Sequence, residues 1–167
     1  MKQQVRIAPL SSRDEAEYIA AARASRKLHQ KWVNPPITRT KFREKLRLMQ
    51  GPVNLAYCVR HLDDDALVGC FEITQIVRGP FRSAYLGYYG FAGQVRRGFM
   101  REGLQQVVRL AFTTLKLHRL EANIQPENLR SVSLARACGF KKEGYSPRYL
   151  KIRGRWRDHE RWAILAS

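Results

Sequence analysis

The spacing of apolar residues changes several times along the chain, and each change predicts a separate helix or strand. Val5–Ala8 reads as a short strand, and Ser11–Asp14 supplies residues that favour the start of a helix. The Ala-rich stretch that follows predicts a helix to about Arg26. A proline pair then interrupts helical structure, and a second helix is predicted from Thr38 or Thr40.

Three apolar runs in the middle of the chain predict strands, because turn-forming residues separate them. The runs are Asn54–His61, Leu67–Val77 and Ser83–Gly90. A triple-aspartate turn follows the first run, and an Arg-Gly-Pro turn follows the second. We therefore expect these strands to form an antiparallel meander.

Beyond the meander the apolar spacing changes to three and four residues, which predicts a long helix from about Gly98 to Lys116. A strand follows at Arg119–Ile124. A further helix is predicted from a cap at Asn128 to Gly139, a residue type that ends helices well. The residues expected to face the core from the long helix are Met100, Leu104, Val107, Val108, Ala111 and Leu115.

The end of the chain predicts a hairpin of two strands, Glu143–Ile152 and Arg161–Leu165. The complete order of elements, β-α-α-β-β-β-α-β-α-β-β, predicts an α/β (α+β) fold in one domain that spans residues 1–167. The chain has 167 residues, of which 44% are hydrophobic, and this is enough for a core of its own.

Composition narrows the class of protein further. No apolar run approaches the ~20 residues that a membrane helix needs, and the N-terminus lacks an apolar signal core. We therefore expect a soluble, cytoplasmic protein without a membrane partner. Cys58, Cys70 and Cys138 show no metal-ligand or redox spacing, so we expect reduced thiols and no metal site.

The net charge is +17, from 31 Lys and Arg against 14 Asp and Glu. This excess indicates polyanionic surroundings, such as RNA, ribosomes or phosphate-rich ligands. The alternative is a basic but merely solvated surface. No run exceeds two consecutive basic residues, so the charge does not form a separate basic tail.

The turn that opens the long helix carries the clearest chemistry. It reads Gln94-Val95-Arg96-Arg97-Gly98-Phe99-Met100. A helix N-terminus presents unpaired N–H groups and partial positive charge, and basic residues next to it add to both effects. The turn therefore predicts a pyrophosphate site.

From Leu67 to Leu165 the chain resembles the GNAT acetyltransferases, in particular the Rim-type N-terminal acetyltransferases of ribosomal proteins. The resemblance implies a twisted, mixed and mostly antiparallel sheet with helices on both faces. It also implies that two central parallel strands splay apart. The motifs that carry the resemblance are Tyr85–Tyr88, Arg97–Glu102, His118-Arg119, Pro126–Ser131, Ala135–Tyr145, Tyr149-Leu150 and Gly154–His159.

The resemblance implies acetyl-CoA as the cosubstrate, with its pantetheine arm lying between the splayed strands. Phe91 and Ala92 would lie near the thioester, where their amides would polarise the acetyl carbonyl. Two residues depart from the family pattern: Val95 replaces a Gln or Arg, and Met100 replaces a Gly or Ala. The residues that would bind the pyrophosphate are Gln94, Val95, Arg96, Arg97, Gly98, Phe99 and Met100.

The resemblance also implies roles for Asn128, which would contact the pantetheine, and for Ser131, which would bind or protonate the departing thiolate. Their spacing of three residues puts both on one face of a helix. An ordinary helix cap is the alternative for Asn128.

The residue that takes the proton from the attacking amine is left open. Relatives often carry an acid where this chain has Arg148. Glu72 is the main candidate for the base, and Asp158 and His159 are further candidates. Alternatively no strong base is needed, because an N-terminal amine with a pKa near 8 is partly neutral at cellular pH.

For the acceptor side we expect Trp32, Tyr88 and Tyr145 to line the cleft, with core or lid packing as the alternative for Trp32. The expected activity is acetyl transfer to a protein N-terminus, with ribosomal proteins as favoured acceptors. Two alternatives are a small-amine acetyltransferase and a basic RNA-binding protein with a disabled fold. Both a monomer and a homodimer fit the sequence.

Overall fold

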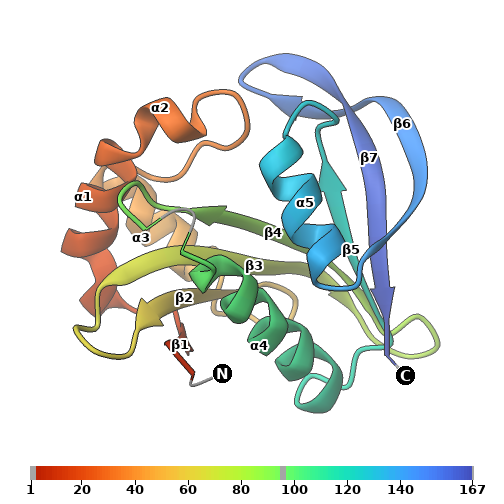
Figure 1. The fold of residues 1–167 in the computed structure, drawn as a ribbon, viewed down its shortest axis with the longest axis horizontal. Coiled ribbons are helices and arrows are strands. Elements are labelled where there is room, and N and C mark those ends of the chain that lie inside the picture. Colours follow the sequence, from red (N-terminus) through yellow and green to blue (C-terminus); the bar gives the residue numbers. More distant parts are fainter. Residues whose placement is uncertain (1–2, 95–96, 167) are drawn as a thin grey trace.

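The computed structural model describes residues 3–94 and 97–166. Figure 1 shows a twisted sheet with helices on both faces. The sheet has seven strands in the order β1-β2-β3-β4-β5-β7-β6. The strands are β1 Val5–Pro9, β2 Leu55–His61, β3 Leu67–Val77, β4 Ser83–Gly90, β5 Arg119–Ile124, β6 Lys141–Ile152 and β7 Arg155–Leu165.

The helices begin where the capping residues predict. The Thr38 hydroxyl accepts a hydrogen bond from the Lys41 N–H, and the Asn128 side-chain oxygen accepts one from the Ser131 N–H. The helices are the short 3₁₀ helix η1 Ser12–Asp14, α1 Glu15–Ala24, α2 Arg26–His29, α3 Arg39–Leu48, α4 Phe99–Thr113 and α5 Leu129–Ala137.

Several predicted boundaries were wrong, including the start of β6, which is Lys141 rather than Glu143, and three of them have a clear cause. The first helix divides at Ser25, whose hydroxyl donates to the Ala21 carbonyl and whose backbone leaves the helical region. The long helix α4 ends at Thr113 rather than Lys116, because Lys116 has a left-handed φ of 55°. The last strand begins at Arg155 rather than Arg161, because long-range pairing with β6 extends it through polar residues.

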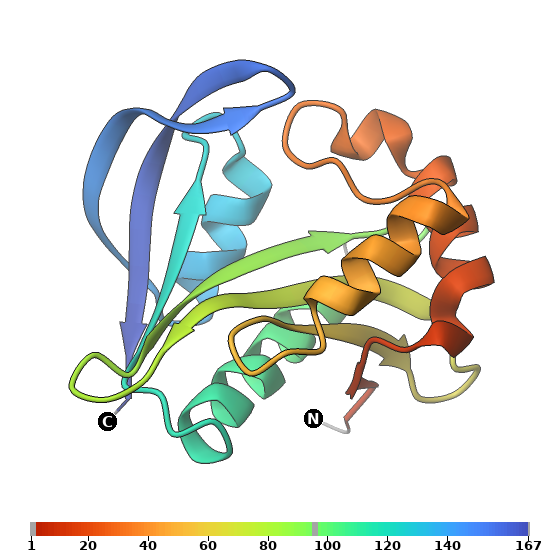
Figure 2. The ribbon, with the colours of Figure 1, turned by 180° about the vertical axis from the view of Figure 1, so that it is seen from behind.

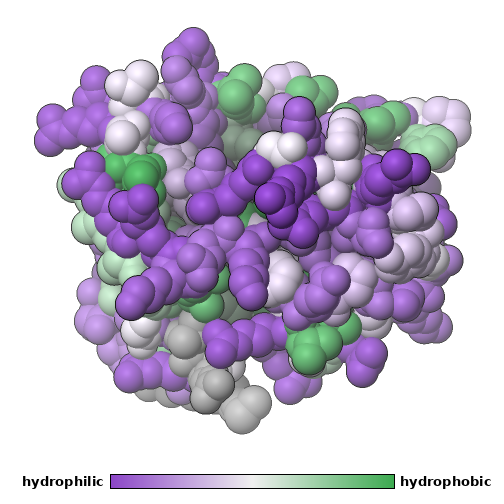
Figure 3. Space-filling model, turned by 90° about the horizontal axis from the view of Figure 1, so that it is seen from above, coloured by the Kyte–Doolittle hydropathy of each residue, from purple (hydrophilic) through white to green (hydrophobic). Residues whose placement is uncertain are grey.

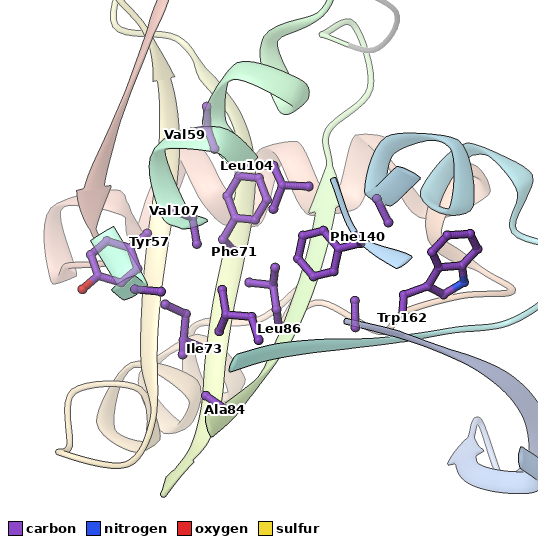
Figure 4. Close-up of a cluster of buried hydrophobic side chains, with 14 of the residues drawn as sticks. Tyr57, Val59, Phe71, Ile73, Ala84, Leu86, Leu104, Val107, Phe140 and Trp162 are labelled. Carbon is purple, nitrogen blue, oxygen red and sulfur yellow. The ribbon is translucent and has the colours of Figure 1, made fainter. Parts of the chain in front are cut away.

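Two layers of side chains hold the helices against the sheet. The larger cluster joins α4 and α5 to one face, and Figure 4 shows part of it, with Phe71 and Leu86 from the sheet beside Leu104 and Val107. The smaller cluster packs α1 and α3 against the opposite face, which is turned toward the viewer in Figure 2. Of the predicted α4 stripe, three residues are fully buried and three partly buried, so the stripe is confirmed.

The sheet opens in its middle, between β4 and β5. These two strands run parallel and pair over only three residue pairs, from Ser83–Arg119 to Tyr85–Glu121. Beyond that point β4 pairs only with β3, and β5 only with β7. Figures 1 and 2 show the two strands diverging from their shared end. The mixed sheet and its splayed parallel strands are thereby confirmed.

Met100 stands at the start of α4, where the family pattern has a small residue, Gly or Ala. The sheet beneath the helix has room for its longer side chain. Its side chain packs over Gly69 of β3 and Gly90 of β4, and its Cγ is 3.4 Å from where a Cβ on Gly90 would lie. Small residues on the strands thus compensate for a large one on the helix. The beginning of α4 is thus fixed against the end of β4 that extends beyond its last pair with β5.

We expect Gly69→Ala to destabilise the fold by about 1–3 kcal/mol, because the site is already filled. A Cβ there would overlap the Met100 sulfur and lie 2.7 Å from the Tyr89 carbonyl oxygen, which the strand cannot easily move. The measurement is urea unfolding. Gly87→Ala is the matched control, because the nearest atom to its Cβ is 3.9 Å away. Equal stability losses in the two variants would contradict this account of the packing.

The described cysteines agree with the expected thiols. All three are free; Cys58 and Cys70 are buried, and Cys138 is partly buried. Burial raises the pKa of the Cys138 thiol to about 11, so that group stays protonated at neutral pH. Within residues 3–94 and 97–166, no helix is both long and apolar enough to cross a membrane.

Candidate active site

A groove of about 1000 Å³ lies where the sheet opens. Its walls come from four separate parts of the chain: the end of α2 with the loop after it, the end of β4, the start of α4 and the start of α5. The lining includes Gln94, Gly98, Phe99, Met100, Asn128, Ser131, Trp32 and Tyr88, eight of the residues predicted from the sequence.

Two helix N-termini meet at this groove. Gly98 precedes α4 with a φ of +80°, a left-handed conformation that favours glycine, and its carbonyl accepts from the N–H groups of Arg101 and Glu102 at 3.0 and 3.1 Å. The N–H groups of Phe99 and Met100 therefore come before the first bonds of the helix. The Asn128 end of α5 lines the same groove. Partial positive charge from both helices converges there.

The acidic residue in the first turn of α4 is directed away from this positive end. Both carboxylate oxygens of Glu102 accept hydrogen bonds from the Gln4 N–H, at 3.0 and 3.2 Å, and one also accepts from the Val5 N–H. Glu102 thus anchors β1 to α4 while its charge is bound on the opposite side of the turn. The groove keeps the positive potential of the helix end.

Cationic side chains strengthen that potential. Lys27, Lys31, Arg101 and Arg130 line the groove, against the single acidic residue Glu127. None of the four was predicted from the sequence to bind a ligand. Arg101 and Arg130 lie in the sequence motifs at the two helix starts, which is a local signal, whereas the two lysines reach the groove only through the tertiary fold. The arrangement suits a ligand with several negative charges.

The structure describes only part of the turn Gln94–Met100, which the sequence predicts to bind pyrophosphate. Gln94 and Gly98 to Met100 line the groove, and Arg97 is exposed beside it. Val95 and Arg96 lie outside the described residues. The role of this turn in binding stays a prediction.

Phe91 and Ala92 stand at the end of β4, but their amides already have acceptors. The Phe91 N–H donates to the Val68 carbonyl and the Ala92 N–H to the Ser25 hydroxyl, both at 2.8 Å. The Phe91 side chain is buried among the aromatic rings of the α1 layer. An acetyl oxygen would have to compete with these acceptors, which weakens the predicted oxyanion role for both residues.

Tyr88 links the two sides of the opening. Its hydroxyl donates to the Ser131 carbonyl at 2.8 Å, which fixes the first turn of α5 against β4. Burial raises the pKa of Tyr88, so its hydroxyl remains a donor. Ser131 and Asn128 are thus held side by side on the groove wall, as their spacing predicts. Their catalytic roles remain predictions.

Glu72 is held by neighbours from other elements. Its carboxylate forms an ion pair with Lys45 of α3 and accepts a hydrogen bond from the Tyr89 hydroxyl at 3.0 Å. Burial alone would lower the pKa of Lys45, but the Glu72 carboxylate outweighs it and keeps that lysine charged. Both contacts hold the carboxylate between α3 and β4, so the position of Glu72 favours a structural role over the predicted catalytic one.

The remaining predicted residues are divided between two regions. Trp32 lines the groove, in the loop after α2. Tyr145 lies on β6, where it donates to Asp158, and it contributes to neither cavity found in the described parts of the chain. Asp158 also accepts from the Arg148 N–H at 2.8 Å, which leaves it occupied. The role of Tyr145 in the acceptor cleft stays a prediction.

His29 is a site residue that the sequence reasoning missed. It is 3% exposed, its Nε2 lies 2.7 Å from the Gly90 carbonyl oxygen, and its ring packs against Tyr89 and Phe91. Its partner is 61 residues away in the sequence, so no local pattern marks it. It ties the end of α2 to the last residue of β4.

We expect stability to fall as the pH drops below about 6.5, the ordinary pKa of histidine. Burial lowers the pKa of His29, and also of His159, so the unfolded chain binds more protons than the folded one in this window. The stabilisation is complete above about pH 6.5 and is lost as the pH falls through the lower folded pKa values. Urea midpoints at about pH 7.5 and 5.5 test this, and equal midpoints would contradict it.

Residues 4–141 match the model of the acetyltransferase (GNAT) domain. The chain belongs to the GNAT acetyltransferase family. Both the fold and the family therefore agree with the resemblance seen in the sequence.

This GNAT chain is similar in sequence to acetyltransferases of two kinds. It is 40% identical over 97 residues to the [ribosomal protein uS5]-alanine N-acetyltransferase of Escherichia coli, covering 58% of this chain and 50% of that one. It is 35% identical over 71 residues to the spermidine N(1)-acetyltransferase of Vibrio cholerae, covering 42% and 41%. The chain thus spans about half the length of the curated relatives it matches.

A solved GNAT structure matches nearly the whole chain. Mycobacterium smegmatis RimJ in complex with CoA-disulfide superposes with a TM-score of 0.90 at 27% identity, covering 97% of this chain and 82% of that one.

Proposed function

We propose that this GNAT protein transfers the acetyl group of acetyl-CoA to the N-terminal α-amino group of a protein, with ribosomal proteins as the favoured acceptors. The observation that carries the proposal is the groove at the open sheet, where two helix N-termini and four cationic side chains converge. Coenzyme A carries a pyrophosphate and a further phosphate, which such a site suits.

The donor would bind along this groove in two parts. The start of α4 would hold the pyrophosphate with the N–H groups of Phe99 and Met100, supported by Arg101. The pantetheine arm would lie beside β4 past Tyr85, where pairing to β5 has ended, and would bond to the strand backbone as an added strand does. The thioester would then lie near Asn128 and Ser131.

The reaction is a direct transfer. A neutral amine attacks the acetyl carbon, a tetrahedral intermediate forms, and the carbon–sulfur bond breaks to release the CoA thiolate. Ser131 would stabilise or protonate that thiolate. Positioning of the donor and of the amine supplies the main rate gain that the site offers.

The choice of a protein N-terminus over a polyamine rests on charge. A net charge of +17 repels a cation such as spermidine and favours encounter with a polyanion such as the ribosome. The β6–β7 hairpin concentrates this charge, because residues 147–157 contain Arg148, Lys151, Arg153, Arg155 and Arg157 and no acid. Figure 3 shows one largely hydrophilic face of the molecule, with hydrophobic groups in small separate patches. A cytoplasmic, ribosome-associated role follows from this proposal.

The alternative function is acetylation of a polyamine, and it is tested as well because a spermidine acetyltransferase is among the relatives. The decisive experiment is a thiol-release assay with acetyl-CoA and a panel of acceptors: Ala- and Ser-starting peptides, spermidine, and no acceptor. We expect turnover with the peptides and much less with spermidine. Preference for spermidine would overturn the choice of acceptor. Salt-sensitive RNA binding without affinity for acetyl-CoA would instead support a disabled, RNA-binding fold.

A further inference from the structure

Two segments without acidic residues meet at one end of the molecule. Residues 18–43 contain seven Lys or Arg and no Asp or Glu, and residues 144–157 contain five and none. The segments are far apart in the sequence, but a cavity of about 380 Å³ lies between them. Arg26 and Asn34 of the first segment and Arg153 of the second contribute to its lining. Positive charge from two parts of the chain is thereby brought together.

The two segments form one continuous surface. Figures 1 and 2 both show the turn between β6 and β7 beside the loop that follows α2. Figure 3 looks onto this end of the molecule, where most of the exposed atoms belong to hydrophilic residues. We call this surface the basic end, and it comprises residues 26–34 and 150–157.

The cations of the basic end are left without acidic partners. The acids that border the second segment are engaged elsewhere: Glu143 pairs with Arg119, and Asp158 accepts from the Tyr145 hydroxyl and the Arg148 N–H. Among the described residues no ion pair is formed by six exposed cations of this surface, which are Arg26, Lys31, Lys151, Arg153, Arg155 and Arg157. Their charge is therefore available to a ligand.

The outer part of the β6–β7 hairpin does not serve the hydrophobic core. No residue from 141 to 158, all of which the structure describes, belongs to either buried cluster. Trp156 lies in this part of the hairpin and is 59% exposed. The basic end thus presents a large flat aromatic ring to solvent in the middle of its positive charge.

Strand register places a cation next to that ring. Trp156 of β7 is the cross-strand partner of Lys151 of β6, so the two side chains lie side by side on one face of the hairpin. Arg155 and Arg157 lie on the opposite face, because side chains alternate along a strand. An aromatic ring flanked by cations matches a ligand that has both flat bases and phosphates.

We propose that the basic end binds a single-stranded segment of RNA. A base would stack on the Trp156 ring, and the phosphates on either side of it would contact Lys151 and the arginines of the hairpin and of α2. Cations alone would suit an acidic protein equally well, and the exposed ring is what favours a nucleic acid. The choice of RNA over DNA rests on the proposed ribosomal acceptors.

This site is separate from the groove assigned to acetyl-CoA. The groove is lined by the starts of α4 and α5, whereas no residue of the hairpin from 150 to 157 is in its lining. RNA and acetyl-CoA would therefore bind at the same time. The RNA contact would hold the enzyme near acceptors that are themselves bound to RNA, and it would take no part in the chemistry.

The test is fluorescence anisotropy with an unstructured RNA of about 12 nucleotides, at about 50 to 200 mM KCl. Each phosphate contact contributes about 0.7 to the slope of log affinity against log salt. Replacing Arg155 and Arg157 together by Gln should therefore reduce that slope by about 1.4 and weaken binding about tenfold.

The matched control for that pair is Arg47→Gln with Arg109→Gln, which removes the same charge from exposed positions on α3 and α4. We expect this control to bind RNA nearly as the wild type does. An equal loss of affinity in the two double variants would mean that net charge alone attracts RNA, and it would overturn the assignment of the site to the basic end.

Trp156→Leu tests the stacking. We expect it to weaken RNA binding about tenfold with the salt slope unchanged, whereas Trp156→Phe, which keeps an aromatic face, should retain most of the affinity. The melting temperatures should match, because the side chain is exposed. Equal affinity of Trp156→Leu and the wild type would overturn the proposed stacking on this ring.

Two competitors distinguish RNA from other polyanions. Polyglutamate should displace the labelled RNA far less well than unlabelled RNA does, and equal displacement would assign the surface to an acidic protein instead. Tighter binding of the same sequence as DNA would overturn the choice of RNA. The assay needs neither acetyl-CoA nor an acceptor, so absence of RNA binding would overturn this inference alone, whereas failure to bind CoA would overturn the proposed function.

Discussion

Gly98→Asp should weaken binding of CoA about 10- to 100-fold relative to Gly98→Asn. Both side chains tolerate the left-handed backbone that Gly98 adopts at a φ of +80°, and both find open space, because nothing lies within 4 Å of a Cβ there. The two variants differ only in one negative charge, placed where the pyrophosphate would sit. Repulsion between like charges at about 4 Å costs roughly 1–4 kcal/mol, depending on exposure to water.

Isothermal titration calorimetry with CoA measures this difference. Gly98→Asn serves as the control for the backbone and for the cap, since Asn and Asp cap helices equally well. Urea unfolding should show both variants folded. Equal affinity of the two variants would mean that the phosphates lie elsewhere and that the start of α4 is not the donor site.

Ser131→Ala should lower kcat about 10²-fold while leaving the affinity for CoA close to that of the wild type. The expected loss is confined to the transition state, because the thiolate acquires its charge only as the carbon–sulfur bond breaks. The Ser131 carbonyl and N–H, which contact Tyr88 and Asn128, belong to the backbone and survive the substitution. The change therefore removes the hydroxyl and little else.

Ser131→Thr provides the matched comparison, because it keeps a hydroxyl at the same position. We expect it to retain most of the activity. Steady-state kinetics at saturating acetyl-CoA distinguish the outcomes. A kcat in Ser131→Ala equal to that of the wild type would assign protonation of the thiolate to water and leave Ser131 as part of the groove wall.

Much of the donor side could be predicted from the sequence, because its signals are local. Gly98 is a positive-φ glycine directly before a helix, and Asn128 caps the helix that brings Ser131 to the groove three residues later. Each of these features depends on neighbours within one helical turn. The apolar spacing of α4 likewise fixed which face would pack on the sheet.

The acceptor side could not be predicted in the same way, because it depends on long-range contacts. Glu72 appeared available by strand alternation, but Lys45 reaches it from a helix 27 residues earlier. His29 has an ordinary context in the sequence, and its position is set by the Gly90 carbonyl, which lies 61 residues further along the chain. The prediction for β7 was also too short, because pairing with β6 extends this strand through a polar segment.

The most direct test of acetyl transfer to an N-terminal amine is mass spectrometry of a product peptide. The peptide should start with Ala or Ser and contain one lysine, and it should be incubated with the protein and acetyl-CoA. The account predicts a single acetyl group, located by fragmentation on the α-amino nitrogen, with the lysine unmodified and one CoA thiol released per acetyl group. Acetylation of the lysine alone, or of added spermidine in preference to the peptide, would contradict it.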